Sequence, residues 1–464
     1  MKKIGKYTVC GLLGKGGMSV VYKAHLPVIG KTVALKLLSP HPNLVSLLGR
    51  EAVRERFISE ALTIASLRSP HIVEIHDFDF HENEPFFTME YYYRDLGRII
   101  GEAYRPDLPS RLLSLDKTIH YTRRLLAGLS RLGRAGIVHR DIKPGNLMVS
   151  DEDEIKICDF GFSRVRGEKL ARPPHLVIGS PFYAAPEQER NPDAVDVRAD
   201  LYSAGVIVHR MLTGLLPEDG PQRPSLCHPD ADPAWDRFVE RAIAPEPARR
   251  FASADEMLAG LEELALAWAA KKENFCRATV LTPDGPQGPV RFKIRSTPVK
   301  VRAENAPQLF GCDGLMRPLR YPETDPAVSA DGSIVFDRSA GLAWQASGTS
   351  DPLDRESAGG YIQRLNAASF GGCSRWRLPT IEELLSITRP PGLDFRDCIA
   401  PVFDRRQKLL WSCDRCTFTS AWYLDVELGF AGCADLTCHF HARAVTEAAN
   451  IESHAAGPRP LPAP

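Results

Sequence analysis

Hydrophobic and polar residues follow regular patterns in the first half of the chain. Apolar and polar side chains alternate over residues 7–38, with glycines between them, which predicts twisted β-hairpins. Residues 50–67 and 112–135 instead carry apolar side chains near helical spacing, and each stretch predicts a helix. The Phe-Phe-Thr-Met run at residues 86–89 indicates a buried strand between these two helices.

The pattern changes after a first domain that we expect to span residues 1–268. The next stretch is rich in proline, glycine and charge and has only short β-like runs, so we expect a linker at residues 269–326 that could hold one small β unit. A second domain would occupy residues 327–446. Residues 447–464 end in a proline- and alanine-rich run, which predicts a disordered tail.

Charge and hydropathy narrow the range of partners. Lys and Arg together number 58, as do Asp and Glu, so global electrostatics gives no reason to expect a nucleic-acid or membrane-surface partner. The first six residues are not followed by the apolar run of a signal peptide, and no apolar run is long enough to span a bilayer. We therefore expect a cytoplasmic protein with reduced thiols and no membrane span.

The chemically richest stretch, residues 139–161, contains Asp141, Lys143, Asn146 and Asp159. Phosphoryl transfer needs a carboxylate that orients a hydroxyl, a cation for the transferring phosphate and oxygen ligands for magnesium. Mg²⁺ prefers a few hard oxygen ligands together with substrate phosphates, which suits Asn146 and Asp159. The stretch therefore predicts a phosphoryl-transfer site.

A glycine-rich run lies near the start of the chain, at residues 13–21, and Val-Ala-Leu-Lys follows at residues 33–36. Glycines let the backbone pass close over phosphates, whose oxygens the amide groups can bind. Alone, such a run is weak evidence, because an ordinary hairpin turn has a similar composition. In order and spacing, however, the run, the segment at 33–36 and the stretch at 139–161 resemble the motifs of eukaryotic-like (Hanks-type) protein kinases.

This resemblance covers about residues 7–266, and Lys143, two residues after Asp141, is typical of the Ser/Thr kinases. It implies an α+β, two-lobed protein kinase fold with a β-rich N-lobe and an α-rich C-lobe. ATP and Mg²⁺, or Mn²⁺ in its place, would bind between the lobes. The implied reaction is transfer of the ATP γ-phosphate to Ser or Thr hydroxyls of protein substrates.

The resemblance also implies roles for single residues. Asp141 would orient the substrate hydroxyl and accept its proton, Lys143 would neutralise the γ-phosphate, and Asn146 and Asp159 would hold the metal. Lys36 would hold the α- and β-phosphates.

Glu60 lies where the family places the partner of Lys36, although a solvated helix face is the ordinary place for a glutamate. Met89 would be the gatekeeper, and backbone groups around Glu90 and Tyr92 would bind the adenine. The residues expected to contact the nucleotide are Leu13, Gly14, Lys15, Gly16, Gly17, Met18, Ser19, Val20, Val21, Ala34, Lys36, Met89, Glu90, Tyr92 and Met148. By the same resemblance, Asp200 would brace the catalytic-loop backbone and Glu187 would pair with Arg250.

Two alternative functions would place the chain in a different class from an active kinase. A pseudokinase scaffold would have the same shape without activity, but such scaffolds usually lack one of Lys36, Asp141, Asn146 and Asp159, and this chain has all four. In the other alternative, the C-terminal domain is a ligand-binding signalling module and the first domain reports on its occupancy.

The C-terminal domain is distinguished by the run Trp376-Arg377-Leu378-Pro379-Thr380, preceded by Gly-Leu-Ala-Trp at residues 341–344 and followed by Trp-Ser at 411–412 and Ala-Trp at 421–422. These segments resemble the C-terminal domain of Legionella collagen-like adhesins. That resemblance implies a compact, mixed α/β fold similar to C-type lectins, and a small-molecule or glycan-like ligand. The tryptophans themselves could simply pack in a core.

Cysteines are concentrated in the same domain. A Cys-x₂-Cys pair and a second, wider pair suggest structural zinc, and the candidate ligands are Cys413, Cys416, Cys433 and Cys438. Ordinary buried or surface thiols are the alternative, and a disulfide would need an oxidising environment.

The segment before Gly179 departs from the usual kinase pattern. Between Arg164 and Gly179 the chain has no Ser, Thr or Tyr, and the segment is basic. A kinase of this type commonly pairs Arg140 with a phosphate on this segment. We therefore hypothesise activation by an acidic partner, an acidic substrate or a ligand of the C-terminal domain, with constitutive activity as the alternative.

Overall fold

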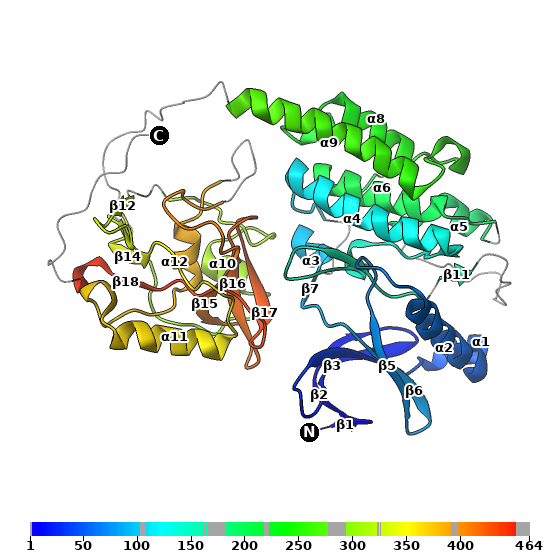
Figure 1. Cartoon of the computed structure of the whole chain (residues 1–464), viewed down its shortest axis with the longest axis horizontal. Helices are drawn as coiled ribbons and strands as arrows, with labels where there is room; N and C mark the ends of the chain where they lie inside the picture. Colours follow the sequence, from blue (N-terminus) through cyan, green and yellow to red (C-terminus); the bar gives the residue numbers. More distant parts are fainter. Residues whose placement is uncertain are drawn as a thin grey trace. The chain divides into compact units, whose positions relative to one another are not determined.

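The computed structural model describes residues 2–102, 108–161, 163–165, 182–192, 194–217, 222–276, 294–322, 324, 326–390 and 398–451 (Figure 1). The chain divides into two compact units, residues 1–274 and 275–464. Each unit has its own core, so each is described by itself.

The first unit begins with a six-stranded antiparallel sheet in the order β1-β2-β3-β4-β6-β5. Its strands are β1 (Lys3–Ile4), β2 (Tyr7–Lys15), β3 (Ser19–His25), β4 (Thr32–Leu38), β5 (Ile75–His81) and β6 (Glu84–Met89), and helices α1 (Pro42–Leu48) and α2 (Arg50–Ser66) come between β4 and β5. The predicted hairpins, the helix at 50–67 and the buried strand at 86–89 are confirmed. Tyr7, Leu35 and Phe86 pack together in the core of this sheet.

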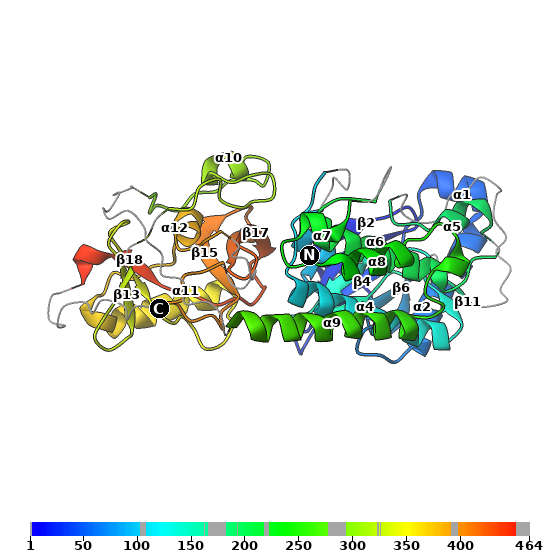
Figure 2. The same ribbon diagram turned by 90° about the horizontal axis from the view of Figure 1, so that it is seen from above.

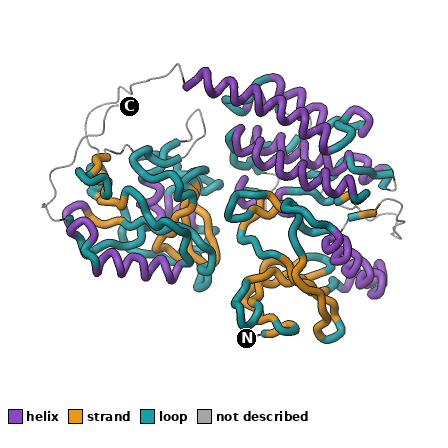
Figure 3. Tube along the Cα trace, viewed as in Figure 1, coloured by secondary structure: helices purple, strands orange, loops and turns teal. Residues whose placement is uncertain are grey.

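The rest of the first unit is mainly helical, and Figure 3 shows strands gathered at one end of the unit and helices at the other. Its helices are α3 (Leu96–Ile100), α4 (Leu115–Arg134), α5 (Pro186–Arg190), α6 (Arg198–Thr213), α7 (Pro224–Cys227), α8 (Pro233–Ala242) and α9 (Ala254–Cys276), with 3₁₀ turns η1 (Pro144–Asn146) and η2 (Pro247–Arg249). The short strands are β7 (Arg94–Asp95), β8 (Ile137–Val138), β9 (Leu147–Val149), β10 (Ile155–Ile157) and β11 (Arg164–Val165). Almost every residue of α6 is buried, which makes α6 the central helix of this half.

Helix α9 lies along α4 and is held there by polar contacts (Figure 2). Arg123 of α4 donates two hydrogen bonds to Glu262 of α9, at 2.6 and 2.7 Å. Farther along, the Trp268 indole and the Lys272 ammonium both donate to Asp116, at 3.1 and 2.6 Å. These contacts fix α4, whose C-terminal end leads directly into β8 and the stretch at 139–161.

The second unit contains two small antiparallel sheets, β12-β13-β14-β18 and β15-β16-β17. Its elements are α10 (Ala306–Phe310), β12 (Pro326–Val328), β13 (Ile334–Asp337), β14 (Leu342–Gln345), α11 (Arg355–Ala367), η3 (Phe370–Gly372), α12 (Ile381–Ser386), β15 (Leu409–Arg415), β16 (Ser420–Asp425), β17 (Phe430–Asp435), β18 (Val445–Glu447) and η4 (Ala448–Asn450). Trp344, Trp376, Trp411 and Trp422 are all buried, so they serve as core residues.

The predicted linker at 269–326 is wrong over much of its length. Residues 269–276 continue α9, and Val301, Ala306 and Phe310 are buried in the core of the second unit. This stretch has no periodic pattern because its order comes from tertiary pairing: the amide of Val301 donates to the carbonyl of Arg415 at 2.9 Å. The tail prediction is likewise wrong for residues 447–451, which finish β18 and form η4, while residues 452–464 lie outside the described part.

Within the part of the chain that the structure describes, no helix combines the length and the apolar character needed to cross a membrane.

A buried carboxylate ties the start of the second unit to its core. Asp414 is fully buried and accepts hydrogen bonds from the guanidinium of Arg295 at 2.9 Å and from the amides of Val299 and Ile381 at 2.8 Å. Removing one member of such a buried pair leaves an uncompensated charge, which typically costs about 3–5 kcal/mol.

We therefore expect Asp414→Ala to lower the free energy of unfolding of the second unit by about 3 kcal/mol. Urea unfolding followed by tryptophan fluorescence measures this loss. Arg406→Ala is the matched control, because the Arg406 side chain is 88% exposed in its ion pair with Asp404. Removal of this exposed side chain should leave the urea concentration at the midpoint of unfolding unchanged. Equal shifts for both variants would contradict the role of Asp414.

Candidate active site

The first unit contains two clusters of polar side chains, and Lys36 lies at the centre of the first cluster. It projects from β4, where it pairs with Val21 of β3 and Phe87 of β6. Its ammonium donates hydrogen bonds to Glu60 Oε1 at 2.6 Å and to Asp159 Oδ1 at 2.9 Å. Burial alone would lower the pKa of Lys36, but the two carboxylates outweigh it and raise the pKa above its ordinary value. Lys36 is thus a permanent buried cation that joins β4, α2 and the segment after β10.

The two carboxylates around Lys36 differ in character. Glu60 on α2 is buried, and burial raises its pKa to about 7 although Lys36 acts in the opposite direction. Asp159 has a side chain that is 43% exposed, and Lys36 lowers its pKa to about 2. Glu60 is therefore suited to holding Lys36, whereas Asp159 is an ionised oxygen donor that solvent and ligands can reach.

The second cluster lies on the loop between β8 and β9. The Lys143 ammonium donates to Asp141 Oδ2 at 2.8 Å. The Asn146 amide donates to the carbonyl of Asp141 at 2.8 Å and to Asp141 Oδ2 at 3.0 Å. Two of the predicted catalytic residues, Lys143 and Asn146, therefore converge on the buried carboxylate of a third, Asp141, and Asn146 retains its side-chain oxygen as a ligand atom.

The loop backbone is strained and is held by the central helix. Arg140 and Asp159 both have positive φ, at 69° and 64°, a conformation that costs a non-glycine residue about 1–3 kcal/mol. Asp200 of α6 accepts hydrogen bonds from the amides of His139 and Arg140, each at 2.8 Å. The imidazole of His139 bonds the carbonyl of Cys158 at 3.1 Å. The predicted brace by Asp200 is present, and the loop is connected to the strand that precedes Asp159.

Asn146 and Asp159 are neighbours in space because the amide of Cys158 donates to the carbonyl of Asn146 at 3.0 Å. An amide oxygen and an ionised carboxylate are donors that fit Mg²⁺, which usually takes one or two protein ligands and completes its shell with water and phosphate oxygens. Among the described residues, no group of three or more His, Cys, Asp or Glu is placed to hold a metal ion. The site therefore suits a cation that arrives with a phosphate ligand.

The glycine-rich run forms the end of β2, the turn and the start of β3. Gly14 pairs with Val21 and Lys15 with Val20, and the amide of Gly16 donates to the carbonyl of Ser19 at 2.9 Å. The other predicted nucleotide contacts in this run, Leu13, Gly17 and Met18, lie on β2 or in the turn. The run is thus the predicted hairpin, and it belongs to the same sheet as Lys36.

The remaining predicted nucleotide contacts lie on β4, β6 and β9. Ala34 pairs directly with Met89, the last residue of β6, and Met148 pairs with Lys156 between β9 and β10. The Glu90 carboxylate accepts from Lys156 at 2.8 Å, and the Glu90 amide donates to the carbonyl of Glu74 at 3.1 Å. These contacts order the segment that follows β6, where Tyr92 lies.

Two supporting residues were missed by the sequence analysis. Arg56, one helical turn before Glu60 on α2, donates from Nε to the carbonyl of Gly161 at 3.1 Å. Gln188 of α5 donates to the carbonyl of Arg140 at 2.9 Å and accepts from the amide of Ala185. The spacing of Arg56 from Glu60 places both residues on one face of α2. This spacing is the only sign in the sequence of the supporting role of Arg56. Gln188 acts through backbone atoms and leaves no such signal.

The segment before α5 is only partly described. Arg166, Lys169, Arg172, Gly179 and Ser180 lie outside the described residues, as does the side chain of Arg164, so the hypothesis about activation stays a prediction.

Past that segment, Arg250 donates to both oxygens of Glu187, at 2.6 and 2.8 Å, as the sequence predicts. The guanidinium of Arg140 donates to the carbonyl of Pro192 at 3.1 Å.

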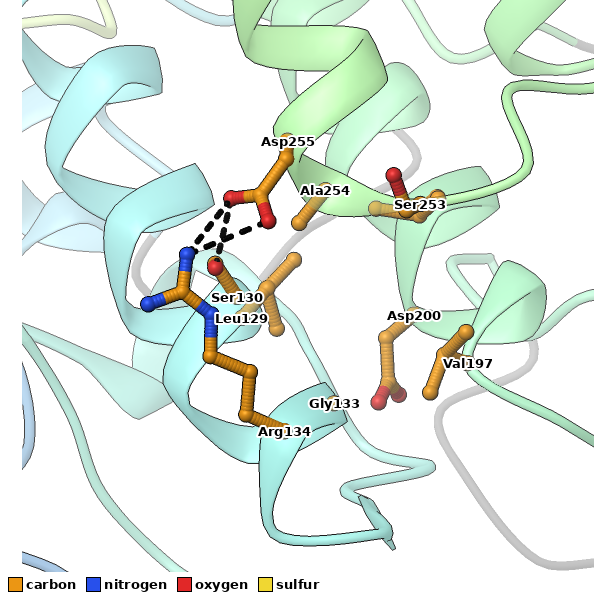
Figure 4. Close-up of a pocket in the computed structure, with 10 residues that line it drawn as sticks. Leu129, Ser130, Gly133, Arg134, Val197, Asp200, Ser253, Ala254 and Asp255 are labelled. Carbon is orange, nitrogen blue, oxygen red and sulfur yellow. Dashed lines mark hydrogen bonds and ion pairs between the residues drawn. The ribbon is translucent and has the colours of Figure 1, made fainter.

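A pocket of about 190 Å³ lies on the far side of the brace, between α4, α6 and the start of α9 (Figure 4). Asp200 forms one wall, and Asp255 at the opposite rim accepts from Ser130 at 2.6 Å and from Arg134 at 3.2 Å. Lys36, Asp141 and their partners do not line this pocket, so it is separate from the candidate active site.

The predicted zinc site is not formed, since no three of its cysteines are placed as metal ligands in the described chain. Cys413 faces the surroundings of Arg377 and Glu383, and burial raises its pKa to about 12. Cys416 instead lies in the buried core of the second unit. The first Cys pair is therefore split between two environments.

The brace by Asp200 leads to a direct prediction. Asp200→Asn replaces one acceptor oxygen by an amide donor, so the amide of His139 or Arg140 loses its partner. We expect faster hydrogen exchange in a peptide that spans residues 137–147 and a loss of about 1–3 kcal/mol in the free energy of unfolding. Asp196→Asn is the control, because that carboxylate binds the partly exposed Arg198 side chain. Unchanged exchange in Asp200→Asn would show that the brace does not hold the loop.

Comparison with known proteins follows the same division into two units. A family model described as protein kinase domain matches residues 7–251, and one described as Lcl C-terminal domain matches residues 333–446. The probable serine/threonine-protein kinase SCO3848 of Streptomyces coelicolor is 36% identical over 279 residues, which is 56% of this chain and 40% of that protein. The serine/threonine-protein kinase pkn3 of Myxococcus xanthus is 34% identical over 55% of this chain and 49% of its own length.

A crystal structure of the Mycobacterium tuberculosis PknI kinase domain is 27% identical, with a TM-score of 0.43, and the match covers 57% of this chain and 97% of that one. The chain spans about half the length or less of the two curated relatives named above. Because the protein kinase model matches more than half of the sequence, this chain belongs to the protein kinase family.

Proposed function

We propose that the chain is a Ser/Thr protein kinase that transfers the γ-phosphate of ATP to Ser or Thr hydroxyls of proteins. The observation that supports this most strongly is the bridge from Lys36 to both Glu60 and Asp159. It joins the sheet, α2 and the metal-binding segment in one arrangement, which is the arrangement that phosphoryl transfer by kinases requires.

In this proposal, each polar group has a distinct task. Lys36 binds the α- and β-phosphates, and Glu60 keeps its ammonium in place. Mg²⁺, held by Asn146 and Asp159, would neutralise charge on the phosphate oxygens. Asp141 orients the acceptor hydroxyl and takes its proton. Lys143, already 2.8 Å from Asp141, stabilises the charge that develops on the γ-phosphoryl oxygens.

The grouping of these residues argues against a pseudokinase scaffold. A scaffold has no need to keep a buried Lys36 paired with two carboxylates, because taking these charges out of water is costly. Nor does it need Asn146 and Lys143 to converge on Asp141. The chain keeps both clusters, each with hydrogen bonds of normal length.

We expect Asp141→Asn to lower kcat about 10²–10⁴-fold while ATP affinity stays unchanged, because Asp141 acts on the acceptor hydroxyl. Transfer of labelled phosphate to a panel of proteins, with and without Mg²⁺, measures the rate, and titration with a fluorescent ATP analogue measures binding. Asp255→Asn, an exposed aspartate on α9, is the control. Wild-type activity in Asp141→Asn would refute the role of Asp141, and lack of transfer by the unaltered protein would favour the scaffold.

We further propose that the second unit recognises a small-molecule or glycan-like ligand and regulates the kinase. Its match to the Lcl C-terminal domain and its separate core support this proposal. A cytoplasmic location stays a prediction from the sequence.

If the proposed regulation operates, the full chain and a chain ending at residue 276 should differ in kcat, and a ligand found by glycan-array or small-molecule screening should change kcat of the full chain alone. Equal activity of the two chains, unaffected by any ligand that binds, would leave the second unit without a regulatory role.

A further inference from the structure

The connection between β6 and β7, residues 90–93, carries the backbone groups that the proposed nucleotide site uses for adenine. Glu90 directly follows β6, and the other end of the connection leads into β7. Strand β7 belongs to the three-stranded sheet β10-β9-β7, in which Asp95 and Lys156 both pair with Met148 of the middle strand. Both ends of the connection are thus held by strands, and the residues between them need other contacts.

Lys156 of β10 reaches the start of this connection. Its ammonium donates a hydrogen bond to each oxygen of the Glu90 carboxylate, both at 2.8 Å, and it lies 5.8 Å from the centre of the Tyr92 ring, within the range of a cation–π contact. The side chains of Lys156 and Glu90 are only 17% and 22% exposed, so this pair is better shielded from solvent than a surface ion pair. One lysine therefore contacts both residues around which adenine is expected to bind.

Glu90 has a second partner in the segment that precedes β5. The amide of Glu74 donates to Glu90 Oε2 at 3.0 Å, and the amide of Glu90 donates to the carbonyl of Glu74 at 3.1 Å. This segment is itself attached to β10, because the amide of Val73 donates to the carbonyl of Ile157 at 3.0 Å. Strand β10 thus holds Glu90 by two routes, one through the Lys156 side chain and one through the backbone before β5.

The electrostatics of the pair favour a lasting contact. Burial acts to raise the pKa of Glu90, but hydrogen bonds from Lys156 and from the amide of Glu74 outweigh burial and lower that pKa. Glu90 is therefore an ionised acceptor at neutral pH, and hydrogen bonds between charged groups are stronger than those between neutral ones. Side chains whose conformation is locked in this way hold a binding site in its productive geometry.

We propose that Lys156 is a positioning residue for the base of the nucleotide, because it holds Glu90 and Tyr92 and so fixes the backbone of residues 90–92 where adenine binds. This inference rests on the proposed kinase function and adds to it a residue that acts through the protein rather than on the phosphates. Removing such a residue weakens binding of the ground state and of the transition state equally, which raises KM and leaves kcat unchanged.

The test measures nucleotide binding by the full chain, with a fluorescent ATP analogue as the probe and with unlabelled ATP and adenosine as competitors. In Lys156→Met, the Kd of both competitors should rise by about tenfold, the size expected for the loss of charge-assisted hydrogen bonds. In phosphate-transfer assays, KM for ATP should rise while kcat at saturating ATP stays unchanged. Lys156→Arg should recover most of the affinity, since a guanidinium also donates two hydrogen bonds to a carboxylate.

Two further variants separate positioning from a general loss of stability. Lys6→Met is the matched control, because Lys6 also pairs with a carboxylate of the first unit, that of Asp77, but is 57% exposed. Its affinity for ATP should equal that of the unaltered chain. Glu90→Gln completes a double-mutant cycle with Lys156→Met. If Lys156 acts through Glu90, the double variant loses no more affinity than the more affected single variant. Should Lys156→Met fail to fold, Lys156→Gln takes its place in the cycle.

Equal affinities of Lys156→Met and the unaltered chain would overturn the inference. Losses that multiply in the double variant would do the same, as would a loss for ATP without one for adenosine, which would locate the effect at the phosphates. The binding measurement needs no phosphate transfer. An unaltered chain that binds ATP without transferring phosphate would therefore refute the proposed activity, while the affinities of the variants would still decide the role of Lys156. An unaltered chain that does not bind ATP would refute both proposals.

Discussion

The first unit depends on one buried cation. Lys36 joins a strand, a helix and a loop that are far apart in the sequence, through contacts of 2.6 Å to Glu60 and 2.9 Å to Asp159. Because burying an unpaired charge costs several kcal/mol, Lys36 would destabilise the arrangement that it now holds if both carboxylates were lost. The position of α2 and the position of the segment after β10 are therefore coupled through one side chain, and Arg56 strengthens this coupling through the carbonyl of Gly161.

The loop between β8 and β9 shows how a rigid core supports strained backbone. Arg140 and Asp159 adopt left-handed conformations that are unfavourable for their residue types. Asp200 compensates by binding two consecutive amides of the loop from α6, which is buried almost all round. The strain is thus maintained by a helix that has little freedom to move. This arrangement orients Asp141, Lys143 and Asn146 toward one another before any ligand arrives.

Sequence reasoning predicted these parts well where the order and spacing of motifs resemble those of protein kinases. The pairing of Lys36 with Glu60, the brace by Asp200 and the pair of Glu187 with Arg250 were all expected, whereas the contact of Lys36 with Asp159 was not. It missed Gln188, because a side chain that binds a distant backbone carbonyl leaves no pattern in the sequence. It also treated residues 294–322 as linker, because their apolar residues are buried by pairing with β15 rather than by a periodic element of their own.

The cysteines show why spacing alone misleads within a sheet. A Cys-x₂-Cys pair binds zinc when a turn brings both sulfurs to one side. Here Cys413 lies within β15 and Cys416 directly follows that strand. The strand register shifts between Trp411 and Arg415, so the spacing in the sequence does not decide where the two sulfurs lie. Cys413 is held through its amide by the carbonyl of Pro379, whereas Cys416 is buried in the core of the second unit, and the packing of the domain rather than the Cys-x₂-Cys pattern determines the environment of each thiol.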